Sequence, residues 1–492
     1  MATSSGPVSA IAAVLPEHSG SSYRIRRTGE GLLMEYGKSR ASIGPVRREM
    51  SWFIGSGAKA RSFLLSVKGF LFQSPIAWYT EDGKWDFAPG YVADDQPYLA
   101  RPVLPGCLQC HASRIQQKAN TQNGYLSPPF LEAGIGCERC HGPGSAHIKN
   151  GRDIVNPAKL DSKRRDSVCE QCHLSGEVRV NRSGKRSAMF TPGEMFSDYV
   201  AVFVRSGNKS GMKVTSHVEN LADSACKMAA GDRLWCGSCH DPHGKPAVSM
   251  RALWYRSKCL TCHEKGMTCK ESTVRRQDRA DDCTSCHMPG TRVVDAEHVV
   301  YTDHSIPRRA TAKRGVMSKD APLVAFPGTT ADARDEGMAY AIAGQRDRAL
   351  KILTRSVSPG SEDGEALLYL AELLNQKHDR NAAIKLYERA VQVSPNQLTG
   401  SVSLGAIRME QGRYEDAIVL WTDALRKNPA LVLVRFHLAR VLVMQGRRAE
   451  AKEVLETALE FNPAFQPARQ ALEQLGRTAA DPDGQHDHAV RQ

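Results

Sequence analysis

The sequence predicts a mainly α-helical protein in which a β-rich N-terminal segment and a C-terminal α-solenoid flank a middle region of irregular structure. Three observations indicate this organisation. β-like stretches occupy the first hundred residues, all 14 cysteines lie between Cys107 and Cys286, and small residues recur every 34 residues towards the C-terminus. The expected parts are a β-rich segment over 1–100, the cysteine-containing domain over 101–310, a linker over 311–329, the solenoid over 330–476 and a disordered tail over 477–492.

The composition is typical of a soluble globular protein and excludes global disorder, since 41% of the residues are hydrophobic and 24% are charged. No stretch approaches the ~18 consecutive apolar residues that a membrane-spanning helix needs, so no transmembrane segment is expected. The chain has 66 Lys and Arg against 53 Asp and Glu, a formal charge of +13. Such an excess is compatible with an acidic partner or with nucleic acid, but the cysteine motifs suggest another origin.

The N-terminal segment is expected to form an antiparallel sheet. Two alternating stretches, Tyr23–Arg27 and Leu32–Tyr36, flank a Thr-Gly-Glu-Gly turn and predict a hairpin. Further β-like stretches follow over 47–54, 62–67 and 71–79. The large apolar side chains here are expected to pack within the sheet rather than to bind a cofactor: Phe70, Phe72 and Trp78.

Twelve of the cysteines belong to six CxxCH units, in which a histidine directly follows a pair of cysteines. The units are Cys107, Cys110 and His111; Cys137, Cys140 and His141; Cys169, Cys172 and His173; Cys236, Cys239 and His240; Cys259, Cys262 and His263; and Cys283, Cys286 and His287. A CxxC pair alone is compatible with a zinc site, a redox dithiol or a disulfide. Histidine accounts for only 16 of 492 residues, so its presence after every pair indicates covalent attachment of haem c, with six haems expected.

The spacing suits haem attachment, because two thiols on one helical turn can add to the two vinyl groups of a haem while the next imidazole becomes the proximal iron ligand. The region around the motifs is rich in Gly, Pro, Ser and charged residues and poor in apolar periodicity. It cannot bury enough side-chain surface to offset the entropy of its own ordering. The haems are therefore expected to form its core.

The haem propionates are expected to offset part of the positive charge. Basic clusters such as Lys163–Arg165 and Arg308–Arg309 are interpreted as propionate partners or as solvated surface. Nucleic acid is therefore not expected as a partner.

The six units resemble those of the multihaem c-type cytochromes of the cytochrome c-554-like superfamily, as do the phrases CHGPGSAH, CHDPHG and TDHSIPRR. The resemblance implies an electron-transfer protein matured outside the cytoplasm, in the periplasm or the extracellular space. The family usually has a further CxxCH unit upstream of the β-rich segment, and none is present here. The apolar stretch Val8–Leu15 has no preceding Lys or Arg and is no convincing signal peptide, so we expect the true start to lie upstream or the leader to have been trimmed.

The distal ligand of each iron decides whether a haem only transfers electrons or also binds a substrate. Six histidines outside the motifs precede residue 310. Five of them are expected to be distal ligands: His147, His217, His243, His298 and His304. The resemblance implies that His147 and His243, which closely follow motifs, reach neighbouring haems, with a hydrogen bond to a propionate as the alternative. His18 is isolated near the N-terminus and is expected to be exposed, which would leave one haem with an open position or another ligand.

Two cysteines, Cys226 and Cys269, lie outside the motifs. They either form a disulfide, as an oxidising compartment would permit, or remain thiols packed beside haems. Neither completes a CxxCK unit of the kind that marks the catalytic haem of nitrite reductases, because Asp223 and Gly266 occupy the positions three residues earlier. That activity is therefore not expected.

The C-terminal third repeats every 34 residues in the pattern of tetratricopeptide repeats. The repeated positions are Ala349, Ala383, Ala417 and Ala451; Leu370, Leu404 and Leu438; Ala390, Ala424 and Ala458; Pro395, Pro429 and Pro463; and the turn glycines Gly344, Gly412 and Gly446, with His378 in place of a fourth glycine. Small alanines let paired helices approach closely, and proline ends each second helix. Four repeats are expected over 330–464, with a capping helix over 465–476. The array either docks a protein partner on its concave face or braces the haem domain.

The favoured interpretation is a secreted electron carrier that relays electrons between redox proteins through six haems. An enzyme is less favoured, and it would be an oxidoreductase acting on a small inorganic nitrogen or sulfur compound at one open haem. A third interpretation is an assembly scaffold with structural haems. No catalytic residue is assigned.

Overall fold

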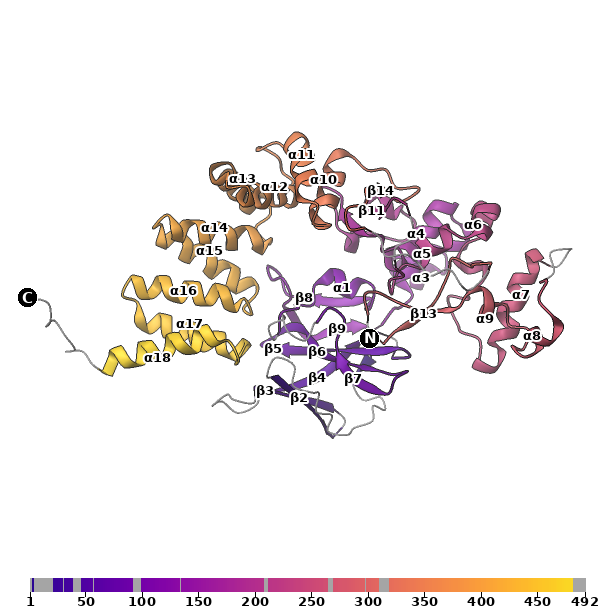
Figure 1. The fold of residues 1–492 in the computed structure, drawn as a ribbon, viewed down its shortest axis with the longest axis horizontal. Helices are drawn as coiled ribbons and strands as arrows, with labels where there is room; N and C mark the ends of the chain where they lie inside the picture. The colour runs from indigo at the N-terminus through magenta and orange to yellow at the C-terminus, as the bar shows by residue number, and fades with distance from the viewer. Residues whose placement is uncertain are drawn as a thin grey trace, which may run out of the picture.

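The computed structural model describes residues 2–3, 21–29, 31–38, 46–55, 57–91, 99–132, 134–207, 211–263, 269–296, 298–308 and 318–480. Figure 1 shows a β-sheet near the N-terminus, a middle region of short helices on one side of it, and a curved stack of paired helices on the other. His18 lies outside the described residues. Within the described ranges, no helix is long and apolar enough to cross a membrane.

Antiparallel strands form the N-terminal sheet in the order β2-β3-β4-β5-β6-β7, with β1 beside β4. Their bounds are β1 Ala2–Thr3, β2 Ser21–Thr28, β3 Gly31–Lys38, β4 Val46–Ile54, β5 Ala60–Val67, β6 Phe70–Tyr79 and β7 Lys84–Phe87. The predicted hairpin is confirmed, with Tyr23 opposite Tyr36, and β4, β5 and β6 confirm the other three β-like stretches. The four-residue strand β7 was not predicted, because it is too short to show a pattern.

The predicted packing residues of this sheet are in its core. Phe72 and Trp78 are buried there, and Phe70 packs against the same cluster. This part of the fold therefore has an apolar core of its own.

The middle region consists of short elements joined by irregular segments. Its α-helices are α1 Pro105–Gln109, α2 Glu138–His141, α3 Ser145–Asn150, α4 Ser162–His173, α5 His217–Ala222, α6 Ala225–Ala230, α7 Arg251–His263, α8 Thr273–Gln277 and α9 Cys283–His287. Its 3-10 helices are η1 Pro157–Lys159, η2 Ser187–Met189, η3 Phe196–Asp198, η4 Gly231–Arg233, η5 Cys236–Ser238 and η6 Val248–Met250. Its strands are β8 Arg114–Gln117, β9 Tyr125–Glu132, β10 Val178–Asn181, β11 Val200–Arg205, β12 Gly290–Arg292 and β13 Val300–Thr302.

Side-chain packing is sparse in the second half of this region. Among the described residues between Met212 and Val293, no apolar side chain is buried. In the first half, by contrast, Leu108 and Ala112 at the first unit and Leu174 after the third unit belong to apolar clusters. The expectation that side chains do not form the core around the cysteine motifs is therefore wrong for that half.

Part of the expected linker over 311–329 is a strand. Leu323–Ala325 forms β14, which pairs with β11 so that Phe203 lies opposite Ala325. The resulting sheet has the order β10-β11-β14. The linker prediction is corrected at these three residues, because so short a strand has no detectable alternation.

The C-terminal third forms the predicted four helix pairs and a capping helix. The pairs are α10 Ala333–Ile342 with α11 Arg346–Ser356, α12 Gly364–Gln376 with α13 Arg380–Val393, α14 Leu398–Glu410 with α15 Tyr414–Lys427, and α16 Val432–Met444 with α17 Arg448–Phe461; the cap is α18 Gln466–Ala480. Residues 477–480 of the expected disordered tail are therefore helical, and the rest of that tail lies outside the described residues.

The repeated residues have the predicted places. The alanines at 349, 383, 417 and 451 are completely buried. Gly344, Gly412 and Gly446 have φ angles of +78°, +73° and +76°, and His378 has a φ of +66°. The histidine thus adopts the left-handed conformation that glycine adopts in the other repeats.

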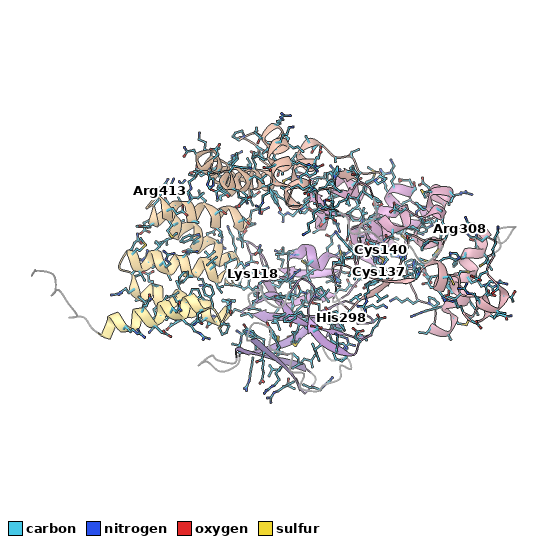
Figure 2. All side chains as sticks on the ribbon, in the orientation of Figure 1. Lys118, Cys137, Cys140, His298, Arg308 and Arg413 are labelled. Carbon is cyan, nitrogen blue, oxygen red and sulfur yellow. The ribbon has the colours of Figure 1, made fainter. Side chains whose placement is uncertain are left out.

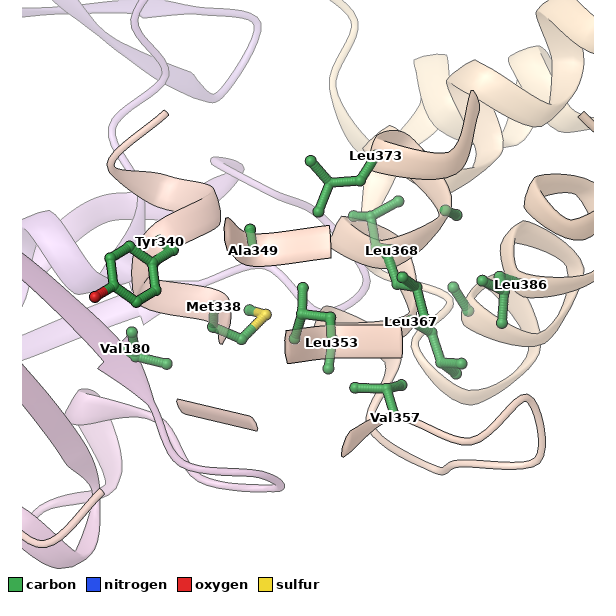
Figure 3. Packing of buried hydrophobic residues seen from close by; sticks show 14 of the residues in the cluster. Val180, Met338, Tyr340, Ala349, Leu353, Val357, Leu367, Leu368, Leu373 and Leu386 are labelled. Atoms are coloured by element: carbon green, nitrogen blue, oxygen red, sulfur yellow. The ribbon is translucent and has the colours of Figure 1, made fainter. Parts of the chain in front are cut away.

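The first repeat is attached to the middle region. Met338 and Tyr340 of α10 belong to the same apolar cluster as Val180 of β10 (Figure 3). The Arg334 side chain donates a hydrogen bond of 2.6 Å to the carbonyl of Asn181. The array and the β10-β11-β14 sheet therefore share one core.

The last repeat is attached to the N-terminal sheet. Phe461 of α17 packs against Phe72, with ring centroids 6.5 Å apart, inside the core of the sheet. Lys68 forms an ion pair of 2.6 Å with Glu460, and Arg48 donates a hydrogen bond of 2.9 Å to the carbonyl of Glu460. The array is thus anchored at both of its ends.

Candidate haem-binding site

Each CxxCH unit lies on or directly after a short helical segment of the middle region. The units are placed by α1, α2, α4, η5, α7 and α9, in chain order. Asp161 caps α4 by accepting a hydrogen bond from the backbone N–H of Arg164, and Asp282 caps α9 by accepting one from Thr284. Helical spacing brings the two cysteines of a unit to one face, which is the arrangement that thioether bonds to a single haem require.

Cysteines of different units lie next to one another. The thiols of three pairs of units affect each other's pKa: Cys110 and Cys172, Cys169 and Cys236, and Cys259 and Cys283. Cys140 of the second unit also acts on Cys169 of the third, and Cys262 of the fifth unit acts on Cys239 of the fourth. The six units therefore lie near one another.

The neighbouring thiols also change the acidity of two of these cysteines. Cys172 lowers the pKa of Cys110 to about 7, and Cys259 lowers the pKa of Cys283 to about 6.

Two motif histidines face histidines from outside the motifs with nearly parallel rings. His141 and His243 have ring centroids 5.8 Å apart and an interplanar angle of 15°. His240 and His304 have centroids 6.2 Å apart and an angle of 27°. Two imidazoles bound to opposite sides of one iron have centroids roughly 6 Å apart, since metal–nitrogen bonds measure about 2 Å. His243 therefore faces the second unit rather than its own, in agreement with its expected reach to a neighbouring haem.

A third contact joins His217 to the third unit. Its ring lies 5.0 Å from that of His173 at an angle of 89°, and 4.8 Å from that of His304. Together with the His240–His304 pair, these contacts make one cluster of imidazoles across the third and fourth units. The structure therefore brings His217, His243 and His304 together with motif histidines.

Hydrogen bonds orient several of these imidazoles. Nδ1 of His141 lies 2.7 Å from the carbonyl of Val155, and Nδ1 of His304 lies 2.9 Å from the carbonyl of Thr302. Nδ1 of His287 lies 3.1 Å from the carbonyl of Pro307. Because a carbonyl only accepts, each Nδ1 carries the proton and each Nε2 keeps its lone pair. This is the tautomer that metal-bound histidines ordinarily have.

Burial keeps the imidazoles uncharged. It lowers the pKa of His111 to about 4 and that of His217 to about 3. It also lowers the pKa values of His173, His240 and His304. Only the neutral imidazole binds a metal, so these side chains are ready to bind iron at neutral pH.

His147 is also buried in part, and its Nδ1 is enclosed without a hydrogen-bond partner among the described residues, as is Nδ1 of His217. A buried polar atom usually has a partner. The donor set, its tautomers and these enclosed nitrogens therefore fit haem iron.

His298 contacts the N-terminal sheet instead of a motif histidine. Its Nε2 lies 2.9 Å from a carboxylate oxygen of Asp86, and its Nδ1 lies 3.0 Å from one of Asp82. Its ring packs edge-on against Tyr79 at 4.9 Å, and Figure 2 shows it beside that sheet. Both ring nitrogens face carboxylates, so iron binding by His298 would require one of these contacts to break.

The remaining cysteines do not form a disulfide in this structure. Cys226 is half-buried and Cys269 is exposed, and both are free thiols. Burial raises the pKa of Cys226. In the part of the chain that the structure describes, no three His, Cys, Asp or Glu side chains are grouped to hold a single metal ion such as zinc.

Two arginines near the first and third units were not predicted. Arg179 lines a cavity of about 240 Å³ together with Cys110 and Gln171, and Arg139 donates a hydrogen bond of 2.9 Å to the carbonyl of Ala112. The Nε of Arg139 is enclosed without a partner among the described residues. Buried guanidinium groups need anionic partners, which haem propionates would supply. Nothing in the sequence distinguishes these arginines from exposed ones, apart from the place of Arg139 inside a CxxCH unit.

Known families match several parts of the chain. The family described as "Cytochrome c554 and c-prime" matches residues 93–142, and "Doubled CXXCH motif" matches residues 227–268. Two families described as "Tetratricopeptide repeat" match residues 334–397 and 408–475.

Curated relatives are similar to parts of the chain. Multiheme cytochrome MtrA of Shewanella baltica is 27% identical over 172 residues, which are 32% of this chain and 51% of the relative. C-type polyheme cytochrome OmcB of Geobacter sulfurreducens is 26% identical, over 37% of this chain and 24% of the relative. Cytochrome c-554 of Nitrosomonas europaea is 33% identical, over 18% of this chain and 41% of the relative. The chain thus spans about half, or less, of the length of these relatives.

Solved structures with likeness to the chain include MamA AMB-1, which is 25% identical over 30% of this chain and 91% of its own length, with a TM-score of 0.28. YrrB, described as a TPR protein with an unusual peptide-binding site, is 18% identical over 29% of this chain and 73% of its own, with a TM-score of 0.26.

Proposed function

We propose that this chain, a multihaem c-type cytochrome with C-terminal tetratricopeptide repeats, relays electrons through six covalent haems in the periplasm or outside the cell. The observation that carries the proposal is the pairing of motif histidines with histidines from outside the motifs, with His243 facing His141 and His304 facing His240 at about the separation expected of two ligands of one iron. Two imidazoles leave an iron no free position for substrate. Each haem, when bound, supplies an iron that exchanges a single electron.

The residues of the chain would divide the task as follows. The cysteines would attach the haems, the motif histidines would supply one ligand to each iron, and His147, His217, His243 and His304 would supply a second ligand to four of the irons. His298 is a fifth candidate only if it leaves Asp82 and Asp86. Carbonyl acceptors such as that of Val155 hold the imidazoles in the ligand tautomer, and the nearness of the units to one another would keep the haems close enough for successive electron transfer.

Charge supports the same assignment. Residues 1–329 contain 45 Lys and Arg against 31 Asp and Glu, whereas residues 330–476 contain 19 of each. The basic excess thus belongs to the part that carries the motifs. Six haems bring about twelve propionate charges, which come close to balancing this excess, so neither nucleic acid nor a general anion-binding role is needed to explain it.

The tetratricopeptide array would hold the relay in a fixed shape and present a surface to a protein partner. Its two anchors, at Met338 and Tyr340 and at Phe461, support the bracing role. The concave face is the proposed docking surface.

A second candidate function follows from His298. If this residue stays with Asp82 and Asp86, four candidate distal histidines remain among the described residues for six irons. A haem without a second imidazole could then bind a small inorganic nitrogen or sulfur compound as an oxidoreductase.

A count of haems and of their spin states tests both proposals. Pyridine haemochrome analysis and intact mass should agree on six covalent haems in protein matured by a competent host. Electron paramagnetic resonance should show at least four low-spin irons. Four or fewer haems would refute the hexahaem relay, and a high-spin iron that binds carbon monoxide in the unmodified protein would favour the enzyme.

A further inference from the structure

The fifth and sixth units lie together in one part of the middle region. α9, which carries the sixth unit, packs against α7, which carries the fifth.

The first unit is partly enclosed by protein, since Leu108 inside it and Ala112 directly after it are buried in one apolar cluster with Tyr125 and Phe130. In contrast, α7, α8 and α9 project at the edge of the molecule, on the side away from the tetratricopeptide array (Figure 1). We call residues 245–263 and 269–287 the distal lobe.

The distal lobe is basic. Its described residues contain eight Lys and Arg against four Asp and Glu. Five of the cations are exposed: Lys245, Arg251, Lys270, Arg275 and Arg279. Arg275 has an ion pair with Glu271 (2.9 Å), whereas Lys245, Arg251 and Lys270 have no ion pair within the described residues.

The other charges of the distal lobe serve its internal structure. Asp281 forms ion pairs with Arg256 of α7 at 3.4 Å and with Arg276 of α8 at 3.3 Å. Lys258 lies over the ring of Trp254 at 4.7 Å. The exposed cations are therefore a separate set, and they are available to a partner.

We infer that the distal lobe is the electron port of the protein, and that it binds an acidic redox protein through Arg251, Lys270 and Arg275. The inference rests on the proposed relay function and adds the place and the chemistry of its partner. A chain of redox centres exchanges electrons with a protein partner where the partner can approach it, and the distal lobe lies at the edge of the molecule and carries exposed positive charge. Complementary charges steer such encounters and fix their orientation.

Charge reversal on the holoprotein tests this inference, with an acidic flavodoxin as the probe. The triple variant Arg251→Glu/Lys270→Glu/Arg275→Glu removes the positive surface. The matched control is Lys351→Glu/Lys385→Glu/Arg413→Glu, which makes the same charge change on the array; Figure 2 shows Arg413 at the far side of the molecule. Binding of oxidised flavodoxin is measured by calorimetry, and reduction of the ferric haems by flavodoxin hydroquinone, one electron at a time, is followed by stopped flow.

At low salt, the distal-lobe variant should bind flavodoxin at least about tenfold more weakly than the unmodified protein does, and it should accept electrons from flavodoxin at least about tenfold more slowly. The array variant should retain both properties, and about 0.5 M salt should abolish the difference. Equal losses in the two triple variants, no loss in the distal-lobe variant, or no binding by the unmodified protein would each overturn the inference.

Reduction by dithionite separates this inference from the relay itself. Dithionite is small and needs no docking surface, so it should reduce both variants as fast as the unmodified protein. Haems that accept no electrons from dithionite would refute the relay. Normal reduction by dithionite combined with unchanged flavodoxin binding would refute only the port.

Discussion

The tetratricopeptide array and the distal lobe contain helices of equal length that are packed in opposite ways. α12 and α7 each have 13 residues, but seven residues of α12 are buried and none of α7 is. The array encloses rows of leucine and alanine that its own repeats supply. The distal lobe relies on ion pairs such as Arg256–Asp281, which contribute only about 0–1 kcal/mol each when exposed. The array thus carries its core in its side chains, whereas the lobe needs a core from its haems.

The largest effect should follow from the loss of haem. We expect the apoprotein, made in a host without cytochrome c maturation, to lose protected amides in α7 and α9 and to keep them in α12 and α13. The reason is that none of the described apolar side chains of the lobe is buried, so the haems have to supply its core. Hydrogen exchange with mass spectrometry measures this directly.

A narrower test removes only the haem of the sixth unit. The variant Cys283→Ala/Cys286→Ala, in otherwise mature protein, should lose amide protection in the distal lobe and keep it in the array. Equal protection of α7 in the apoprotein and the holoprotein would show that the lobe folds without haem, and the comparison between the two regions would fail.

The next largest effect concerns the anchor between the array and the sheet. Phe461→Ala removes a buried ring from the core that contains Phe72, and we expect it to lower the free energy of unfolding by about 3–5 kcal/mol. Amide protection should fall in both α17 and β6. Phe465→Ala is the matched control, because its partly buried ring packs only in the cluster of the last repeats. If amide protection fell only in α17 of the Phe461 variant and not in β6, the contact between Phe461 and Phe72 would not couple the array to the sheet.

A more local effect distinguishes two histidines that the sequence treated alike. His243→Ala should create one high-spin haem that binds carbon monoxide, because it removes the imidazole facing His141. His298→Ala should leave the haem spectrum unchanged and should loosen the contact with Asp82 and Asp86. A new carbon monoxide-binding haem in the His298 variant would instead identify His298 as a ligand, as the sequence predicted.

These residues also show how far the sequence could predict the structure. The CxxCH units and the 34-residue period could be predicted, because haem attachment and helix pairing each need fixed residue types at fixed local spacing. The contact of His243 with His141 could not be predicted, because His141 lies about a hundred residues earlier in the chain and their contact depends on the fold. The same holds for Arg179, for β14 and for the contact of Phe461 with Phe72. His298 lies in a phrase typical of ligands, but its neighbours Asp82 and Asp86 come from a distant turn.

The smallest expected effect tests the array's own stability at the one turn that departs from its pattern. His378 has a φ of +66°, whereas the corresponding turns use glycine at +73° to +78°. A residue with a Cβ is strained at this φ by roughly 1–2 kcal/mol, and glycine would relieve that strain. Glycine also increases the conformational entropy of the unfolded chain, which offsets about 0.4–1 kcal/mol of the stabilisation. His378→Gly should therefore raise the free energy of unfolding of the array by up to about 1 kcal/mol, measured by denaturant titration of helical circular dichroism, with unchanged haem content. His378→Ala is the control, because alanine is strained at the same φ and should give no gain. If alanine stabilised the array as much as glycine does, the strain would lie in the imidazole's surroundings rather than in the backbone, and this explanation of the substitution at 378 would be wrong.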